Sequence, residues 1–300
     1  MIKSKQLLTG FRRVGLLGFP EDRNSSFLRG PALAPPLIRA AFASPAFNTS
    51  DESGNDVNEW LTDFGGVPTT ECSDHKSLFL SVEPLIANIV AQHHSPLILG
   101  GDHSITYSIV KSLHQIYRSK ISIVHFDAHP DIYHSFEGSP HSHACQFARL
   151  FEEDIVESMV SIGVRTACRH QRDQMQRFNV KAIEAKDFVS HEKNLHSSLS
   201  RLLQTPPSSS SSFPVYISFD VDVIEPGLAP GVSHREAGGL TPRQCLQAIH
   251  AIPGNIVGAD IVEFNPTRDP TGLTADVAGK LMKELASKIM RCYGAHLQQP

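Results

Sequence analysis

The stretch SIVHFDAHPDI, residues 122–132, places Asp127, His129 and Asp131 at every second position behind a short apolar run. Because the side chains of an extended segment alternate, all three can converge on one side of the chain. Carboxylates at the end of a buried strand are costly unless they are paired or bound to a metal. The spacing therefore predicts metal ligands, with a hydrogen-bonded polar loop as the alternative for this triplet taken alone.

A second stretch, VYISFDVDVIEPG at residues 215–227, places Asp220 and Asp222 directly after another apolar run. Two neighbouring carboxylates repel each other, which raises the pKa of one of them unless a cation compensates. Taken alone, the pair also fits an acid/base dyad. Together with the first cluster, it favours a metal site.

A third stretch, LILGGDHSITY at residues 97–107, ends its apolar run with two glycines, which allow a sharp turn and a close backbone approach. His103 follows them, and Ser104 can cap the next helix. A histidine in such a place is more often structural than a ligand. His103 becomes a candidate ligand because the carboxylate clusters need a further nitrogen donor.

These three stretches together offer four carboxylates and two imidazoles, which balance the charge of two divalent cations. Oxygen-rich donors with some imidazole and no thiolate suit Mn²⁺ better than a zinc site built from cysteines. Two such ions about 3.5–4 Å apart can share a hydroxide and lower its pKa, which is hydrolytic chemistry. The six candidate ligands are His103, Asp127, His129, Asp131, Asp220 and Asp222.

The segments that must position these residues alternate between short apolar runs and longer amphipathic ones. Continuously apolar runs are typical of parallel strands that are covered on both faces, and sites in such sheets form outside the carboxyl ends of the strands. The pattern predicts an α/β fold with three layers (αβα) and a mostly parallel central sheet. Strands are predicted at 14–18, 96–99, 121–126, 158–164, 215–219 and 256–262, and helices near 31–43, 79–93, 104–118, 142–152, 191–204, 241–251 and 274–291.

The strand and helix alternation continues through the whole chain, which predicts one domain over residues 1–300. Residues 46–58 are polar and rich in helix breakers, and residues 205–213, TPPSSSSSF, form a low-complexity loop. We expect both segments to be connections inside the domain.

Composition limits the partners and the compartment. With 27 Lys and Arg against 31 Asp and Glu, the net charge of −4 gives no reason to expect binding to nucleic acid or to an anionic membrane. No apolar stretch approaches the roughly 20 residues that span a bilayer. Five cysteines without a CxxC pair indicate a reducing, cytoplasmic environment. The basic first twenty residues leave a mitochondrial presequence as the weaker alternative.

The chain resembles the ureohydrolase family of arginases and agmatinases, and within it most closely the plant-type arginases. The resemblance covers about residues 14–291 and implies an arginase-like fold. The shared family segments are GGDHS at 100–104, DAHPD at 127–131 and SFDVDVIEPGLAPG at 218–231; the plant-type ones are NSSFLRGPALAPPLIR at 24–39, DIYHSFEG at 131–138, SHACQFAR at 142–149, PGVSHREAGGL at 230–240 and VGADIVEFNPTRD at 257–269.

This resemblance implies two manganese ions per chain. It places one among His103, Asp127, Asp131 and Asp220, and the other among Asp127, His129, Asp220 and Asp222, so that Asp127 and Asp220 are shared and Asp127 is also catalytic.

The resemblance also implies roles in substrate binding. Glu263 would bind the guanidinium group, and His143 would contact the substrate and deliver a proton, with His141 as its rival. Tyr133 and Ser135 follow the DAHPD motif and would contact the distal end of the substrate.

The implied reaction is the hydrolysis of a small guanidino substrate by a hydroxide shared between the metals, with L-arginine giving L-ornithine and urea. Agmatine and other guanidino or formimino compounds stay open as substrates. A catalytically inactive metal-binding scaffold and a deacetylase-like hydrolase are the alternatives from other classes. A homo-oligomer, trimer or hexamer, is expected from the resemblance alone. Glu225 stands where most of the family has Asp, as a tolerated replacement or as a change in the following loop.

Overall fold

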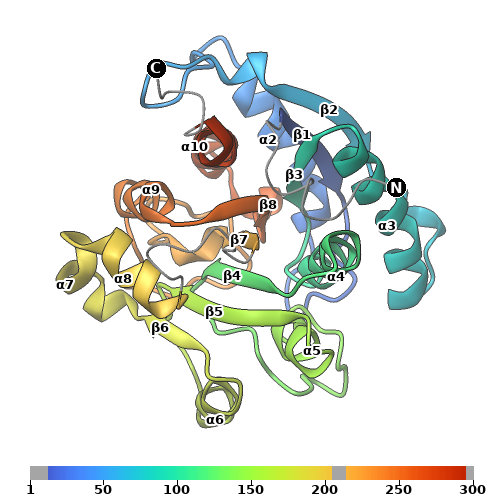
Figure 1. Ribbon diagram of the computed structural model, residues 1–300, viewed down its shortest axis with the longest axis vertical. Coiled ribbons are helices and arrows are strands. Elements are labelled where there is room, and N and C mark those ends of the chain that lie inside the picture. Colours follow the sequence, from blue (N-terminus) through green and yellow to red (C-terminus); the bar gives the residue numbers. More distant parts are fainter. Residues whose placement is uncertain (1–12, 205–213, 295–300) are drawn as a thin grey trace.

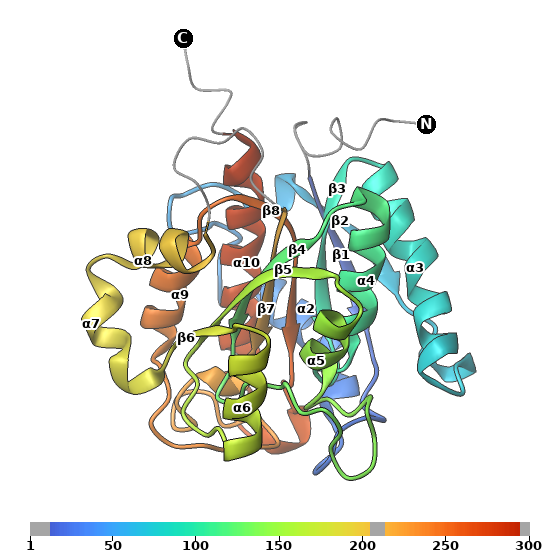
Figure 2. The ribbon, with the colours of Figure 1, turned by 60° about the horizontal axis from the view of Figure 1, so that its bottom comes forward.

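The computed structural model describes residues 13–204 and 214–294, with side chains to residue 291. Within these residues one sheet contains eight strands in the order β2-β1-β3-β8-β7-β4-β5-β6, and every strand pair is parallel. Figures 1 and 2 show this sheet between two layers of helices, which confirms the predicted fold class. The strands are β1 (Arg13–Phe19), β2 (Leu61–Gly66), β3 (His94–Gly100), β4 (Ile121–Phe126), β5 (Val156–Ile162), β6 (Lys181–Ile183), β7 (Pro214–Asp220) and β8 (Asn255–Val262).

Each face of the sheet packs against its own group of helices, and each helix layer buries one cluster of apolar side chains. One face is covered by α2 (Ala34–Phe42), α7 (Phe188–Glu192), α8 (Leu195–Leu202), α9 (Pro242–Ala251) and α10 (Leu273–Gly294). The other face is covered by α3 (His75–Ala91), α4 (Ile105–Tyr117), α5 (Gln146–Glu152) and α6 (Arg169–Arg177).

Alternation along the strands explains why the sheet is apolar on both faces. In β4, Val124 and Phe126 pack in the cluster that includes α10, whereas Ile121 and Ile123 pack in the cluster that includes α4. His125 therefore faces the same side as Ile123, because side chains two residues apart share a face. This polar residue inside an apolar strand lies directly beneath the carboxyl end of the sheet.

All six predicted strands are present, but β2, β6 and α6 were not predicted. β2 and β6 are the two edges of the sheet. An edge strand packs against fewer neighbours, so its residues need not form an apolar run; β2 reads LTDFGG and is mostly exposed or half-buried. α6, with the sequence RHQRDQMQR, lacks a wide apolar face, and this is why its helical character is not visible in the hydrophobic pattern.

Several helix boundaries differ from the prediction. α3 begins at His75, because Asp74 forms a capping box with Ser77. α5 begins at Gln146, so the predicted helical start at 142 is a loop instead. The helix predicted near 191–204 corresponds mainly to α8, and α7 overlaps only its first two residues.

The two predicted connecting segments have different outcomes. Residues 46–58 are mainly irregular, with an isolated bridge between Ser50 and Asp56 and the start of a short 3-10 helix at Val57. The predicted loop at 205–213 lies outside the described residues, and the assignment of 1–300 to one domain stays a prediction. Among the described residues, none of the helices combines the length and the apolar character that a bilayer crossing needs.

A buried carboxylate on α10 makes the stability of the fold depend on pH. Glu284 is fully buried and hydrogen-bonds His250 at 2.8 Å and Lys280 at 2.6 Å. Although burial alone raises its pKa, these hydrogen bonds outweigh burial and lower it from 4.5 to about 2. A carboxyl with a lowered pKa stabilises the fold above its unfolded value of 4.5, and this contribution is lost as pH falls towards 2.

We therefore expect Glu284→Gln to lower the free energy of unfolding at pH 7 by roughly 2 kcal/mol, allowing for partners that are partly exposed. Thermal unfolding of wild type and variant between pH 7 and pH 3 measures this difference. The gap between their Tm values should narrow below about pH 4.5, since the wild-type carboxyl then loses its charge. A Tm difference between wild type and variant that stays constant from pH 7 to pH 3 would contradict the lowered pKa of Glu284.

Candidate metal centre

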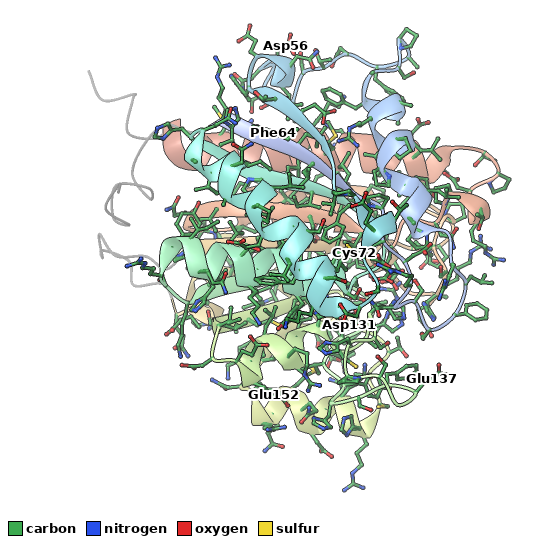
Figure 3. All side chains as sticks on the ribbon, turned by 90° about the vertical axis from the view of Figure 1, so that its right-hand side faces the viewer. Asp56, Phe64, Cys72, Asp131, Glu137 and Glu152 are labelled. Atoms are coloured by element: carbon green, nitrogen blue, oxygen red, sulfur yellow. The ribbon has the colours of Figure 1, made fainter. Side chains whose placement is uncertain are left out.

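Three loops at the carboxyl end of the sheet bring the six predicted ligands together. His103 follows β3, Asp127 follows β4 and Asp220 ends β7, and parallel strands place these points at the same edge. His103 Nδ1 lies 3.2 Å from Asp127 Oδ2, 3.1 Å from Asp131 Oδ2 and 3.2 Å from Asp220 Oδ2. Asp131 is buried, whereas Glu137 of the following loop is exposed and lies at the edge of the molecule in Figure 3.

A second group of donors lies on the other side of Asp127. His129 Nδ1 is 3.2 Å from Asp127 Oδ1 and 3.0 Å from Asp222 Oδ2. Asp222 Oδ1 also accepts the backbone N–H of Ala128 at 3.0 Å, which ties the β4 and β7 loops together. The geometry thus forms two donor groups that share Asp127. Asp220, the second shared ligand that the resemblance implies, lies 3.2 Å from His103 Nδ1, and its place in both groups stays a prediction.

The hydrogen bonds around His103 fit a metal ligand. Asp260 accepts hydrogen bonds from four donors, namely the hydroxyls of Thr106, Ser218 and Tyr216 and the backbone N–H of Phe219. Ser218 therefore gives its proton to Asp260 at 2.8 Å and accepts one from His103 Nε2 at 2.9 Å.

This tautomer leaves a lone pair on His103 Nδ1. That atom is buried and has no hydrogen-bond partner, although three carboxylate oxygens lie within 3.2 Å of it. A lone pair that faces three anionic oxygens is unfavourable unless a cation lies between them. The donor set therefore fits a bound metal ion.

The charges of the carboxylates also indicate a bound metal ion. Burial first, and then the nearby Asp222 and Asp127, raise the pKa of Asp220. Burial and Asp127 also raise the pKa of Asp222. The ion pairs that the structure describes join Asp127, Asp131, Asp220 and Asp222 to histidines and to no lysine or arginine. A cation is thus needed to keep these groups ionised together.

A row of polar residues across the sheet supports this centre and was not predicted. Register pairs His125 of β4 with Ser161 of β5 and with Ser218 of β7, and Ser218 with Asp260 of β8. Each residue is a buried polar side chain between two apolar neighbours in its strand, which is the signal that could have identified it. His125 Nδ1 lies 3.1 Å from Ser161 Oγ, and its Nε2 lies 2.9 Å from Asp127 Oδ2.

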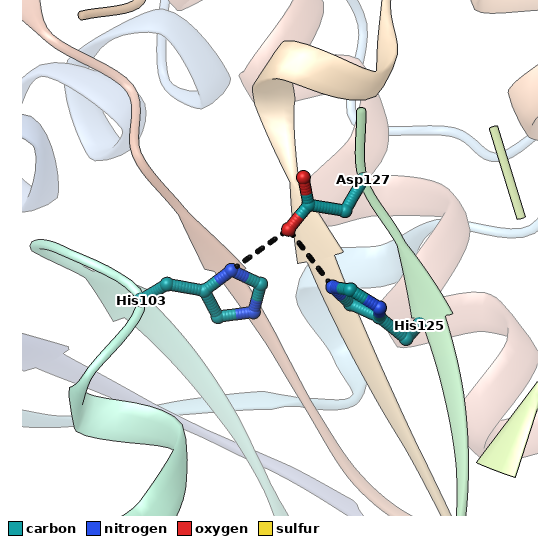
Figure 4. A group of neighbouring side chains, drawn as sticks. All are labelled: His103, His125 and Asp127. Atoms are coloured by element: carbon teal, nitrogen blue, oxygen red, sulfur yellow. Dashed lines mark hydrogen bonds and ion pairs between the residues drawn. The ribbon is translucent and has the colours of Figure 1, made fainter. Parts of the chain in front are cut away.

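Figure 4 shows Asp127 between His103 and His125. His103, His125 and Asp127 place one donor atom each within 4.8 Å of one another, as do Asp127, His129 and Asp222. His125 can therefore act either as a further ligand or as a support for Asp127. We favour support, because both of its ring nitrogens already have partners and His103 has three carboxylates around it.

Ser218→Ala tests the support of the metal centre. The variant removes the acceptor for His103 Nε2–H and should weaken Mn²⁺ binding about 10- to 100-fold, the usual cost of losing such a support. Metal titration followed calorimetrically measures the affinity, and Ser122→Ala, which changes a buried serine nearer the start of β4, is the matched control. Equal Mn²⁺ affinity in Ser218→Ala and wild type would refute the role of Ser218.

A cavity of about 200 Å³ opens beside the carboxylates. Its wall includes Glu263 and His143, whose Nδ1 lies 2.7 Å from Glu263 Oε1. His143 Nε2 lies 2.8 Å from Ser26 Oγ. The cavity is lined by Ser26, His129, Asp131, Tyr133, Phe136, His143, Ala144, Thr166, Cys168, Gln171, Asp220, Asp222, His234 and Glu263.

Two site residues have backbone conformations that L-amino acids rarely adopt. Asp131 has φ 48° and Glu263 has φ 63°. Each such residue costs of order 1 kcal/mol or more, and proteins keep this strain mainly where it positions a functional group. The strain therefore supports a functional role for both side chains.

Close backbone approach explains a glycine before His103. A Cβ on Gly101 would lie 1.8 Å from the carbonyl oxygen of Glu21, so any side chain there would displace the loop after β1. That loop is needed at the site, because its Ser26 contacts His143. The close approach predicted for the glycine pair is therefore present.

The remaining predicted site residues lie in different places. Tyr133 lines the cavity, and its hydroxyl is 3.2 Å from Cys168 Sγ. Ser135 is exposed and does not line the cavity, so we do not retain it as a substrate contact. His141 stacks on His75 with ring centroids 4.1 Å apart and is not part of the cavity wall. His143, the other candidate for the proton-transfer role, does line the cavity.

Glu225 has a clear structural role. Its Oε2 accepts the backbone N–H groups of Gly238 at 2.7 Å and Gly239 at 2.9 Å. The carboxylate thereby holds the end of the loop that follows the Asp222 segment. The side chain of Glu225 thus reaches two backbone donors.

Comparison with known proteins agrees with the sequence resemblance. The family model described as "Arginase family" matches residues 12–287. The chain is 41% identical over 284 residues to "Arginase 1, mitochondrial" of Oryza sativa subsp. indica, covering 92% of this chain and 81% of that protein. It is 30% identical over 273 residues to a guanidinobutyrase of Pseudomonas aeruginosa, covering 90% and 84%. The solved structure of the arginase from Medicago truncatula superposes with a TM-score of 0.84 at 36% identity, covering 96% and 91%.

Proposed function

The chain belongs to the arginase family of hydrolases, which act on guanidino carbon–nitrogen bonds, and on this premise we propose that it hydrolyses L-arginine to L-ornithine and urea. The observation that carries the proposal is the cavity in which Glu263 and His143 lie beside Asp131, Asp220 and Asp222. A carboxylate, an imidazole and these three candidate metal ligands thus line one cavity, which supports the proposal.

Glu263 has an oxygen available for the substrate. Its Oε1 accepts from His143 Nδ1 at 2.7 Å and from the backbone N–H of His103 at 2.8 Å. No hydrogen bond from another described residue reaches Oε2. A planar guanidinium, which offers only N–H donors, is a suitable partner for that oxygen.

We propose that two Mn²⁺ ions are held by His103, Asp127, Asp131 and Asp220 and by Asp127, His129, Asp220 and Asp222. When bound, such ions lower the pKa of a water molecule and so supply the nucleophile at neutral pH. The protein's own part is to hold the ligands in place, through the polar row beneath them and the backbone N–H of Ala128. The absence of thiol donors among these residues supports manganese over zinc.

His143 is the proposed proton donor to the departing amine. Burial lowers the pKa of His143, but Glu263 outweighs burial and raises it to about 9, so the ring carries a proton at neutral pH. It lies in the cavity wall next to the proposed guanidinium site, where a donor to the leaving nitrogen must lie.

The lining of the cavity bears on the choice of substrate. It includes Tyr133, Cys168 and Gln171, and it contains no lysine or arginine. A carboxylate of the substrate would therefore be held by neutral donors. Similarity to the rice arginase is higher than to the guanidinobutyrase, and this favours arginine. Agmatine and other guanidino compounds are the alternative substrates.

Urea release from arginine, agmatine and 4-guanidinobutyrate by the Mn²⁺-loaded protein tests the proposal. We expect kcat/KM to be highest for arginine. A higher kcat/KM for either other compound would change the substrate but keep the reaction. No urea from any of them, with two Mn²⁺ bound per chain, would favour an inactive scaffold, and a single ion per chain would favour a deacetylase-like site.

The oligomeric state and the cellular location of the protein are also proposed here. We propose a homo-oligomer, a trimer or hexamer, which the molar mass in solution would test. A cytoplasmic location is proposed from the cysteine pattern, while the rice relative is named as mitochondrial. Residues 1–12, which bear on a presequence, lie outside the described residues.

A further inference from the structure

One histidine of the cavity wall has no role in the reaction described above. His234 lines the cavity, and its ring centroid lies 5.5 Å from that of His143 and 5.8 Å from that of His129. It thus lies close both to the proposed proton donor and to a proposed metal ligand. No hydrogen bond or ion pair joins its ring to another of the described residues, so both ring nitrogens are available to a ligand.

The backbone just before His234 is firmly held. Ser233 is buried, donates from Oγ to the carbonyl oxygen of Leu28 at 2.8 Å and accepts from Asn265 Nδ2 at 2.9 Å. Val232 forms a bridge with Phe264, next to Glu263 in sequence. These contacts connect the start of the loop to the segment that carries the proposed guanidinium-binding residue.

The backbone after His234 is held as well. Arg165 donates two hydrogen bonds, of 2.7 and 3.1 Å, to the carbonyl oxygen of Glu236. Glu225 accepts the N–H groups of Gly238 and Gly239. A side chain between two fixed segments loses little further entropy when it binds a ligand, so its position is preorganised.

The chemistry of the ring suits a guanidinium. A neutral imidazole has one donor and one acceptor nitrogen, whereas a guanidinium offers N–H donors only. Glu263 Oε2 can take one edge of that cation, which leaves other N–H groups to be satisfied in the cavity.

We propose that His234 is a further substrate-contacting residue, which accepts an N–H hydrogen bond from the guanidinium group held by Glu263. This inference rests on the proposed function, because it takes a guanidino compound as the substrate. It adds an imidazole acceptor to the carboxylate of Glu263 in the proposed guanidinium site.

The test compares wild type with His234→Phe, which keeps a ring of similar size without the acceptor, and with His234→Gln, which keeps an acceptor. His196→Gln, at an exposed histidine of α8, is the control. KM and kcat are measured for the best substrate, and the affinity for guanidinium ion is measured by calorimetry on the Mn²⁺-loaded proteins. Metal content and Tm are recorded for each.

We expect His234→Phe to raise KM and the Kd for guanidinium about 10- to 100-fold, the range for a hydrogen bond to a charged group. We expect kcat to change by less than about 3-fold, because a contact made equally in the ground state and the transition state acts on KM. His234→Gln should recover part of the affinity. Metal content and Tm should match those of wild type.

Unchanged KM and guanidinium affinity in His234→Phe would overturn the proposal. A loss of bound metal in both variants would overturn it as well, because the ring would then support the metal centre. If wild type releases no urea, the proposed function fails. The guanidinium affinities of wild type and His234→Phe, measured by calorimetry, still test whether His234 contacts the guanidinium group. Wild type that neither turns over a guanidino compound nor binds guanidinium would refute both.

Discussion

Asp127→Asn is expected to reduce urea release at least about 1,000-fold and to remove bound manganese, because Asp127 is shared by both proposed donor groups. An amide has nearly the same size as a carboxylate but carries no charge, and only one of its two polar atoms can bind a cation. The change therefore removes charge from both groups at once while keeping the packing.

Metal content by elemental analysis and kcat/KM for arginine are the two measurements. Asp173→Asn, at an exposed position of α6, is the matched control and should behave as wild type. Hydrogen bonds from neighbouring histidines outweigh burial and lower the pKa of Asp127, so its charge stabilises the fold, and Tm of the metal-free variant should lie below that of metal-free wild type. A single cooperative unfolding transition in both proteins would show that the loss of metal is not a loss of fold. Full metal content together with full turnover in Asp127→Asn would show that the metal centre is assigned wrongly.

Glu263→Gln is the second change for which we expect a large loss. Removing one charge from a buried pair costs roughly 2–5 kcal/mol, which corresponds to about a 30- to 5,000-fold drop in kcat/KM. Two effects contribute: the guanidinium loses its anionic partner, and His143 loses the charge that raises its pKa to about 9.

The change in the pKa of His143 can be tested by the pH dependence of activity. A proton donor works only below its pKa, so activity falls at the alkaline side as pH rises past that value. In Glu263→Gln the pKa of His143 should move back towards 6.5, and the alkaline fall should begin at lower pH than in wild type. Glu157→Gln, at an exposed position of β5, is the control. An alkaline limb that stays at the same pH would argue against His143 as the donor.

The fold class could be predicted because the buried strands are apolar on both faces, as in VGLLG and ISIVHF. The edge strands β2 and β6 could not be predicted in the same way. An edge strand has a neighbour on one side only, so its sequence is free to be polar and carries little periodic signal.

The candidate ligands could be predicted because their signal is local. Asp127, His129 and Asp131 alternate within one segment directly after an apolar run, and Asp220 and Asp222 repeat the pattern. Alternation within a segment is set by backbone geometry and needs no knowledge of distant residues.

Only the tertiary structure decided which distant side chains complete the centre. His125, Ser218 and Asp260 are buried polar residues between apolar neighbours in their strands, and their role depends on the register that places them side by side. The anchored loop that directs His234 into the cavity depends likewise on Glu225 and Arg165. Register between parallel strands is set by the packing of the helices that connect them, because these strands are joined by long crossovers and not by tight turns. That packing involves the whole chain, whereas the spacing of ligands within a strand does not.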